Sequence, residues 1–191
     1  MIVFIGLGNV GDRYARTKHN FGFWVVDELA RRWRMRFKPG KGDYIYAKDT
    51  LKKVLLGKPV SGMNRSGIPV KEMRDRWNIS LEDLHIIVDD VDLPLGVMRI
   101  RPKGGDGCHR GMESVIYHLE ESKFPRIRMG IAADNNTRPA EEYVLKPFRR
   151  KDRGLVERMI NRGADAVESI LERGIEKTMS EYNRIEEEVA I

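Results

Sequence analysis

The chain has 191 residues, of which 41% are hydrophobic and 34% are charged. This size and balance are typical of one globular domain with a full hydrophobic core, and they exclude a disordered or collagen-like chain. The net charge is +6, and the single cysteine, Cys108, excludes an internal disulfide.

The sequence contains no apolar run of the roughly 18 residues that a membrane-spanning helix needs. Its N-terminus, MIVFIG, has neither the basic lead nor the cleavage site of a secretory signal. With one thiol and no such signal, we expect a cytoplasmic protein that does not contact a membrane.

The charge is distributed unevenly along the chain. Residues 1–151 contain 29 basic and 19 acidic residues, a net charge of +10, whereas residues 152–191 contain 6 basic and 10 acidic residues, a net charge of −4. A basic body with an acidic tail favours an anionic partner, of which nucleic acid is the commonest. The same charge fits equally well with a role in solubility alone.

Strands and helices are predicted from the spacing of apolar residues, and Asn20 and Asp152 are placed to cap two of the helices. The predicted elements, in chain order, are a strand over 2–5, a helix over 21–33, strands over 44–47 and 53–56, a helix over 66–77, strands over 84–88 and 96–101, a glycine-rich loop over 103–111, a helix over 112–119, a strand over 127–132, and helices over 152–172 and 175–189.

This alternation predicts the α/β class. We expect a single three-layer domain over residues 1–191, with one mixed sheet between helical layers and a C-terminal helical segment over about 152–189. The sequence shows no internal repeat and no low-complexity linker.

Residues 6–11, GLGNVG, match the G-x-G-x-x-G pattern of dinucleotide-binding folds. That pattern needs a helix that opens at the loop and an acidic residue at the end of a second strand. Residues 12–20 have little helical apolar spacing, and Asp27 and Glu28 fall inside the predicted helix. We therefore expect the loop to turn the chain and display Asn9, and we retain nucleotide-dependent oxidoreduction only as an alternative.

Polar side chains follow several of the predicted strands, where ligands gather in open α/β sheets. Asn9, His19, Asn64, Asp89 and His109 hold such places. A histidine base, a carboxylate that holds its ring and amides that bind a carbonyl could hydrolyse an ester or amide. The alternatives are turn roles for the asparagines, a solvent-exposed loop position for His19, and solvated or cation-binding aspartates. Structural roles are the simplest interpretation of His85 and His118.

Four segments together resemble the bacterial-type peptidyl-tRNA hydrolases, and the resemblance spans Ile2 to about Asn183. Each segment is weak alone, but their order and spacing are specific. They are GLGNVG-x-x-Y-x-x-TKHN at 6–20, MNRSG at 63–67, DDVDLPLG at 89–96 and the loop KGGDGCHRG at 103–111.

The resemblance implies a mixed, mostly parallel twisted sheet and hydrolysis of the ester between a peptide and the 3′ ribose of tRNA. It makes His19 the catalytic base, Asp89 its orienting carboxylate and Asn64 the carboxamide near the reacting carbonyl and water. Asn9 matches the residue that distinguishes a blocked from a free aminoacyl group. The other implied substrate or tRNA contacts are Tyr14, Gly62, Met63, His109, Arg110, Arg99, Arg101 and Arg128.

No metal or organic cofactor is implied, and we expect a monomer that binds peptidyl-tRNA without an obligatory protein partner. Several residues depart from the family pattern. Arg110 replaces an asparagine, Gly62 replaces an aromatic residue, and Asp106 and Cys108 replace a histidine and a glycine of the loop. These departures affect the grip on substrate and leave the reaction class intact. The rivals are a non-catalytic RNA-binding member of the same fold and a cysteine hydrolase that uses Cys108.

Overall fold

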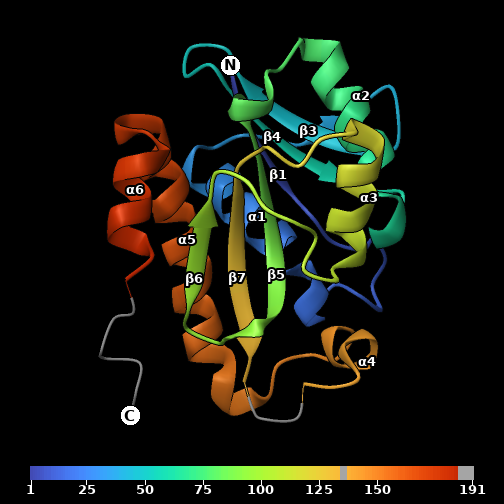
Figure 1. Ribbon diagram of the computed structural model, residues 1–191, viewed down its shortest axis with the longest axis vertical. Coiled ribbons are helices and arrows are strands. Elements are labelled where there is room, and N and C mark those ends of the chain that lie inside the picture. Colours follow the sequence, from blue (N-terminus) through green and yellow to red (C-terminus); the bar gives the residue numbers. More distant parts are fainter. Residues whose placement is uncertain (134–136, 185–191) are drawn as a thin grey trace.

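The computed structural model describes residues 1–133 and 137–184, and within them the strands form one seven-stranded sheet (Figure 1). The strand order is β2-β3-β4-β1-β5-β7-β6. The four neighbouring strands β4, β1, β5 and β7 are parallel, while β2, β3 and β6 pair antiparallel with their neighbours. The strands are β1 (Ile2–Gly6), β2 (Lys38–Pro39), β3 (Tyr44–Asp49), β4 (Val54–Pro59), β5 (Leu84–Pro94), β6 (Met98–Arg101) and β7 (Arg126–Ala132).

Helices cover both faces of the sheet, so the predicted three-layer α/β class with a mixed, mostly parallel sheet is confirmed. The α-helices are α1 (Phe21–Arg32), α2 (Gly67–Trp77), α3 (Arg110–Leu119), α4 (Ala140–Val144), α5 (Arg153–Arg173) and α6 (Ile175–Tyr182). Short 3-10 turns lie at η1 (Lys18–Asn20), η2 (Met63–Arg65), η3 (Leu81–Asp83) and η4 (Arg150–Asp152).

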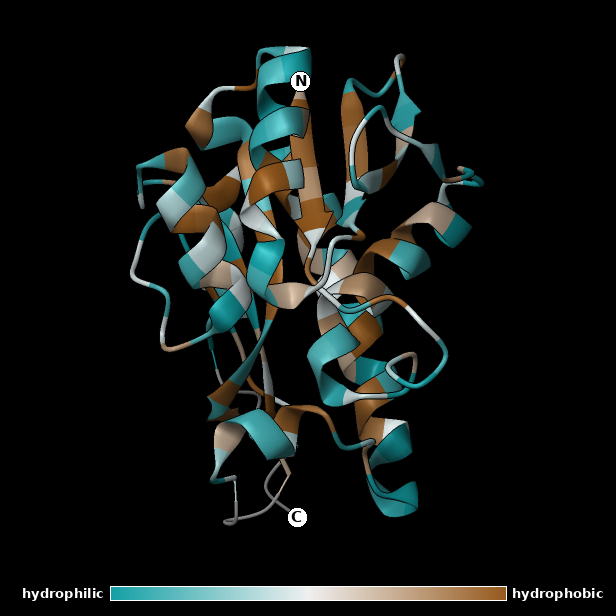
Figure 2. Cartoon of the chain, turned by 90° about the vertical axis from the view of Figure 1, so that its right-hand side faces the viewer, coloured by the Kyte–Doolittle hydropathy of each residue, from teal (hydrophilic) through white to brown (hydrophobic). Residues whose placement is uncertain are grey.

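Alternation along the strands produces two hydrophobic cores. In β1, Phe4 packs into a core with α1 and α5, whereas Val3 and Ile5 pack into the opposite core with α2 and α3. Figure 2 shows hydrophobic residues on the strands and hydrophilic residues on the outer faces of the helices. Among the described residues, no helix combines the length and the apolar character that crossing a bilayer requires.

The edge of the sheet formed by β6 and β7 has a different composition on its two faces. Met98, Ile100, Ile127 and Met129 face the core under α1 and α5. Arginines alternate with these residues at positions 99 and 101 of β6 and at positions 126 and 128 of β7, and Arg126 contacts the glycine-rich loop. This basic sheet face lies beside the parallel strands whose ends carry the candidate site.

The structure differs from the predictions in a few elements. β5 continues to Pro94, so Asp89 lies within the strand, where it pairs with Met129 of β7. The short β2 and α4 were not predicted. The last helix is described to Tyr182, and residues 185–189 of its predicted span lie outside the described residues.

Two predicted helix caps are wrong in their chemistry. Asn20 precedes α1 and Asp152 precedes α5, but neither side chain makes a capping hydrogen bond. The Asp152 carboxylate instead accepts from Arg149, and the Asn20 carboxamide binds the backbone of Asn9. Asn20 therefore serves the candidate site rather than the helix.

Candidate active site

Close packing of glycines positions the start of the site. A Cβ atom on Gly6 would lie 2.1 Å from the carbonyl oxygen of Gly22, so only glycine lets α1 pack this closely on β1. α1 begins at Phe21, and no helix opens within residues 6–11. Gly6 and Gly8 of this motif thus allow close packing against α1, whereas Gly11, with a φ of +103°, meets nothing within 4 Å. The absence of a helix at residues 6–11 agrees with our setting the dinucleotide interpretation aside.

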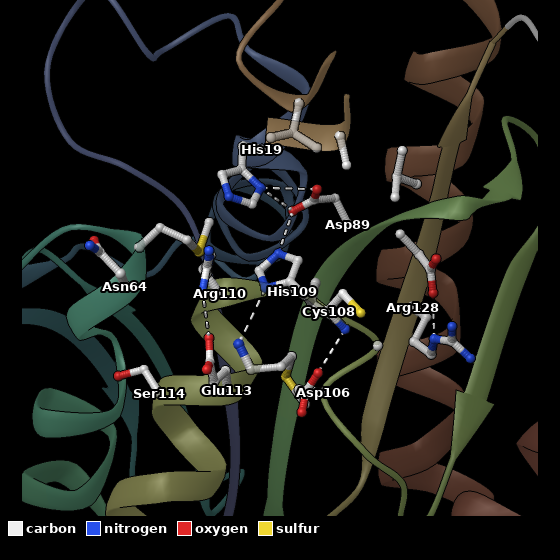
Figure 3. A pocket seen from close by; sticks show the side chains of 18 of the residues that line it. His19, Asn64, Asp89, Asp106, Cys108, His109, Arg110, Glu113, Ser114 and Arg128 are labelled. Atoms are coloured by element: carbon white, nitrogen blue, oxygen red, sulfur yellow. Dashed lines mark hydrogen bonds and ion pairs between the residues drawn. The ribbon is translucent and has the colours of Figure 1, made fainter. Parts of the chain in front are cut away.

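The packing of α1 on β1 and β5 places His19 against Asp89. The Nδ1 atom of His19 lies 3.0 Å from each oxygen of the Asp89 carboxylate. His19 is 8% exposed and Asp89 is 2% exposed. An ionised carboxylate can only accept hydrogen bonds, so Nδ1 of His19 carries the proton and donates it. In the neutral ring, Nε2 is then the nitrogen without a proton, and it is on the side of the ring away from Asp89 (Figure 3).

His19 and Asp89 shift each other's pKa in opposite directions. Burial lowers the pKa of His19, but the negative charge of Asp89 and its hydrogen bond outweigh burial, so the pKa is raised above its usual value. Burial raises the pKa of Asp89, but the positive potential of His19 and His109 and their hydrogen bonds hold it well below its usual range. Asp89 is therefore a permanent anion at neutral pH.

His109 binds the same carboxylate from the other side. Its Nε2 atom lies 3.1 Å from Oδ1 of Asp89. Its Nδ1 atom accepts hydrogen bonds from the backbone N–H groups of Gly111 and Met112, at 3.1 and 3.2 Å, and so caps the N-terminus of α3. Because Nδ1 accepts, Nε2 must carry the proton and donate it to Asp89. Both ring nitrogens of His109 are occupied, so the ring is fixed between Asp89 and the start of α3.

Asn9 is held rigidly at the mouth of the site. The Asn20 carboxamide accepts from the Asn9 backbone N–H at 2.7 Å and donates to the Asn9 carbonyl at 2.9 Å. The side-chain Oδ1 of Asn9 accepts from the Met63 N–H at 2.9 Å. This orientation leaves Nδ2 of Asn9 as a donor beside the cavity, and the described residues include no hydrogen-bond acceptor for it.

A cavity of about 920 Å³ opens beside the His19–Asp89 pair (Figure 3). Asn64 is exposed on η2 at its rim and lies apart from the pair in Figure 3. Of the residues predicted for the site, those that line the cavity are Asn9, Tyr14, His19, Met63, Asn64, Asp89, Arg101, His109, Arg110 and Arg128.

Two predicted contacts lie outside this lining. Gly62 has a φ of +91°, a region that favours glycine, and a Cβ built on it would meet nothing within 4 Å. Backbone strain rather than lack of space therefore opposes the aromatic side chain that the family has here. The guanidinium of Arg99 donates to the carbonyls of Met98 and Asn183 at the edge of the sheet. Its position gives no support to the phosphate contact that the resemblance implied.

Arginines stand directly opposite one another on β6 and β7. Arg99 pairs with Arg128, and Arg101 pairs with Arg126. Like charges at opposed positions of a sheet are destabilising, so a cluster of this kind favours a bound anion. Arg128 forms an ion pair with Asp90, whereas Arg101 donates to the carbonyl of Ile100.

Arg126 was not predicted, and it holds the glycine-rich loop. Its side chain is 2% exposed and donates to the carbonyls of Gly104, Gly105, Ser122 and Phe124. Burial, assisted by the charge of Arg128, lowers its pKa to about 10. The signal that could have revealed it is the alternation of Arg126 and Arg128 in a strand whose other side chains are apolar.

Ion pairs also cross the mouth of the cavity. Arg110, at the start of α3, contacts Glu141 of α4 at 3.2 Å and Glu113 at 3.4 Å. Arg138 contacts Asp92 at 2.6 Å. These pairs join α4 and the residues before it to the side of the sheet that carries His19 and Asp89, and their side chains are exposed, so solvent screens them.

His19, Asp89 and His109 each offer one possible metal-ligand atom, and these atoms lie within 4.8 Å of one another, a spacing at which a metal ion could be held. Both imidazoles already donate N–H groups to the carboxylate. A metal ion bound among them would break both of these hydrogen bonds. It would also require His109 either to give up its cap of α3 or to change its tautomer. The observed bonding fits a proton-transfer pair better than a ligand set.

Cys108 is exposed beside His109 with a φ of +58°, and its N–H donates to Asp106 at 2.7 Å. A cysteine nucleophile needs a base that removes its proton. Both nitrogens of the neighbouring His109 are engaged by Asp89 and by α3. The geometry therefore disfavours the cysteine-hydrolase alternative.

The chain is similar over most of its length to known peptidyl-tRNA hydrolases. Residues 3–190 match the family model described as peptidyl-tRNA hydrolase. The peptidyl-tRNA hydrolase of Geobacillus thermodenitrificans is 40% identical over 185 residues, covering 96% of this chain and 100% of that protein. That of Bacillus subtilis is 39% identical over 185 residues, covering 96% and 98%.

The fold agrees with the same comparison. The crystal structure of peptidyl-tRNA hydrolase from Acinetobacter baumannii superposes with a TM-score of 0.90 at 28% identity, covering 97% of this chain and 96% of that one. Together with the sequence matches, this likeness shows that the chain belongs to the peptidyl-tRNA hydrolase family.

Proposed function

We propose that this protein hydrolyses peptidyl-tRNA by general-base activation of water, with His19 as the base. The observation that carries the proposal is the buried His19–Asp89 pair, in which Nδ1 of His19 faces the carboxylate and Nε2 points away from it, at the wall of a cavity that is lined with cationic side chains. Membership of the peptidyl-tRNA hydrolase family supports the same reaction.

The proposed chemistry begins with proton transfer. Nε2 of His19 takes a proton from a water molecule as the water oxygen attacks the ester carbonyl carbon, and a tetrahedral intermediate forms. Asp89 keeps the ring in the required tautomer and stabilises the imidazolium. The intermediate then breaks the bond to the ribose 3′ oxygen, which takes the proton back from His19. The products are the peptide acid and free tRNA, and no covalent enzyme intermediate is needed.

Amide donors complete the site. Nδ2 of Asn9 is oriented by the bonds to Met63 and Asn20, so it can donate to a peptide carbonyl at little entropic cost. A neutral donor of this kind favours a blocked aminoacyl group, because a free α-amine is cationic and offers no acceptor there. We assign Asn64 to the reacting carbonyl and water, a role that requires its exposed side chain to turn inward.

Cationic residues hold the tRNA in this proposal. Arg101, Arg110 and Arg128 line the cavity together with Lys103. Guanidinium groups bind phosphate oxygens through charge-assisted hydrogen bonds. The ion pairs of Arg110 with Glu141 and of Arg128 with Asp90 support this assignment, because each guanidinium already binds an anionic group.

We further propose that the protein acts in the cytoplasm as a single-domain monomer without an obligatory protein partner, metal or organic cofactor. The basic body and the family membership support this setting. Size-exclusion chromatography with light scattering at micromolar concentration should give one chain per particle, and a stable dimer would contradict the proposal.

The reaction is tested with N-acetyl-aminoacyl-tRNA as substrate. His19→Ala should lower kcat by about 10²–10⁴-fold, which is the usual contribution of a general base. Its circular dichroism spectrum should match that of the wild type. Turnover by His19→Ala at the wild-type rate would refute the base assignment. Failure of the wild type to release peptide, with tRNA binding intact, would instead favour the non-catalytic RNA-binding alternative.

A further inference from the structure

One face of α3 lines the cavity along its whole length, well beyond the catalytic pair. Arg110, Glu113, Ser114, Tyr117 and His118 all contribute to the lining. Their spacing is i, i+3, i+4, i+7 and i+8, which is one stripe of an α-helix. Arg110 and Tyr117 are therefore two turns apart, about 10.5 Å along the helix axis. The proposed hydrolysis of the ester uses only the His109 end of this stripe.

The glycine-rich loop forms the opposite wall of the same groove. At one end, His109 binds Asp89 and caps α3. At the other end, the N–H of Gly104 donates to Ser122, just beyond α3, and Arg126 binds the carbonyls of Gly104 and Gly105. Loop and helix thus run side by side from the catalytic pair to the C-terminal end of α3.

Tyr117 is the unusual member of this stripe. Its side chain is 76% exposed, although a large aromatic residue on a helix normally packs into a core. The ring contacts His118 edge-on, with centroids 5.1 Å apart and an interplanar angle of 79°. This contact restricts the ring while most of it remains open to the groove.

The groove that Tyr117 lines also contains cationic side chains that suit a single-stranded nucleic acid. Arg101 and Lys103 line the same groove, and within the described residues neither has a carboxylate partner. An exposed aromatic ring beside unpaired cations is the arrangement that binds unpaired bases, because the ring stacks on the base and the cations neutralise the phosphates.

We infer that Tyr117 is a stacking platform for an unpaired base of the tRNA 3′ end, one that precedes the terminal nucleotide. The inference rests on the proposed function, which places the terminal ribose ester at His19. From there the single-stranded 3′ end of the tRNA runs along α3, and Arg101 and Lys103 contact its phosphates. Tyr117 thereby adds a contact that depends on an unpaired end and not on the peptide.

Binding of short RNA tests this role without requiring turnover. A fluorescently labelled single-stranded RNA that ends in CCA is titrated with the wild type and with Tyr117→Ala, Tyr117→Leu and Tyr117→Phe. Loss of one base stack weakens binding by about 5- to 150-fold. We expect that loss in Tyr117→Ala and most of it in Tyr117→Leu, whereas Tyr117→Phe keeps the ring and should bind within about twofold of the wild type.

A second RNA identifies the partner of the ring. A set of oligonucleotides is used, each with one abasic position. The one that lacks the stacked base should bind the wild type weakly, and Tyr117→Ala should cause no further loss of affinity for it. Unchanged binding in Tyr117→Ala, an equal loss in Tyr117→Phe, or an equal loss with every abasic RNA would each overturn the inference. Hydrolysis of N-acetyl-aminoacyl-tRNA by the wild type decides the proposed function separately.

Discussion

The buried cluster of His19, Asp89 and His109 and the cationic rim of Arg101, Arg110 and Arg138 share one cavity but are built in opposite ways. His19, Asp89 and His109 are largely shielded from solvent, and each hydrogen bond among them fixes a proton position. These arginines are exposed, and carboxylates on neighbouring segments bind two of them, Arg110 and Arg138. Buried, fully satisfied networks are rigid, whereas exposed ion pairs exchange partners at low cost. The difference predicts that changes in the pair alter turnover and that changes in the rim alter affinity.

The largest effect we expect here is on Asp89, whose carboxylate positions both imidazoles. Asp89→Ala should lower kcat by about 10²-fold, as misplacement of a catalytic group commonly does, with a smaller effect on KM. The loss should be smaller than that of His19→Ala, because the base itself remains. Steady-state kinetics on N-acetyl-aminoacyl-tRNA measure both. A change confined to KM would place Asp89 with the rim instead.

The pH dependence of turnover reports the charge of Asp89. His19 acts as a base only when its Nε2 is unprotonated, so kcat/KM should fall as the pH drops through the pKa of His19. That pKa is raised by Asp89, so the acid limb should lie above the usual value for histidine. Asp89→Asn removes the charge and should move the limb to lower pH. A limb that stays in place would show that Asp89 does not govern the protonation of His19.

The rim is tested by a matched pair of arginines on one strand. Arg101 lines the cavity, whereas Arg99 is bound to Asn183 at the sheet edge. Arg101→Ala should reduce the slope of log Kd for tRNA against log salt concentration by about 0.7–1, the loss of one phosphate contact. Arg99→Ala, which removes the same charge two residues away, should leave the slope close to the wild-type value. Equal slopes in the two variants would contradict this division of the rim.

Apolar patterning predicted most of the fold, because each long element buries one periodic face. It failed where an element is too short to show a period, as in β2 and α4. It also ended β5 at Val88, since the strand continues through polar residues that pair with β7. The side-chain caps at Asn20 and Asp152 failed because other groups compete for the same oxygens.

The candidate site was predictable where one motif carries one role, and less so where roles depend on distant residues. The sequence places Arg99 and Arg101 on the same face of a strand, and it does not reveal that Arg99 contacts Asn183, 84 residues further along the chain. The helix-capping role of His109 gave no signal, because capping is usually a task of Ser, Thr, Asp or Asn. Its tautomer follows from backbone N–H groups that sequence spacing does not reveal.

The smallest effect concerns Glu141, which binds the Arg110 guanidinium across the mouth of the cavity. A phosphate that binds Arg110 must replace this carboxylate, so Glu141 competes with substrate. Both side chains are exposed, and such a pair is weak. Glu141→Gln should therefore tighten tRNA binding only by about two- to fivefold, and more at low salt than at high salt.

Glu142 offers the matched control for Glu141, since it lies next to it on α4 and is paired with Lys146 outside the cavity lining. Glu142→Gln makes the same change of net charge without freeing Arg110. If general repulsion between acidic residues and tRNA were the cause, both variants would tighten binding equally. A gain confined to Glu141→Gln, and abolished when Arg110→Ala is combined with it, would show that the carboxylate acts by occupying the guanidinium.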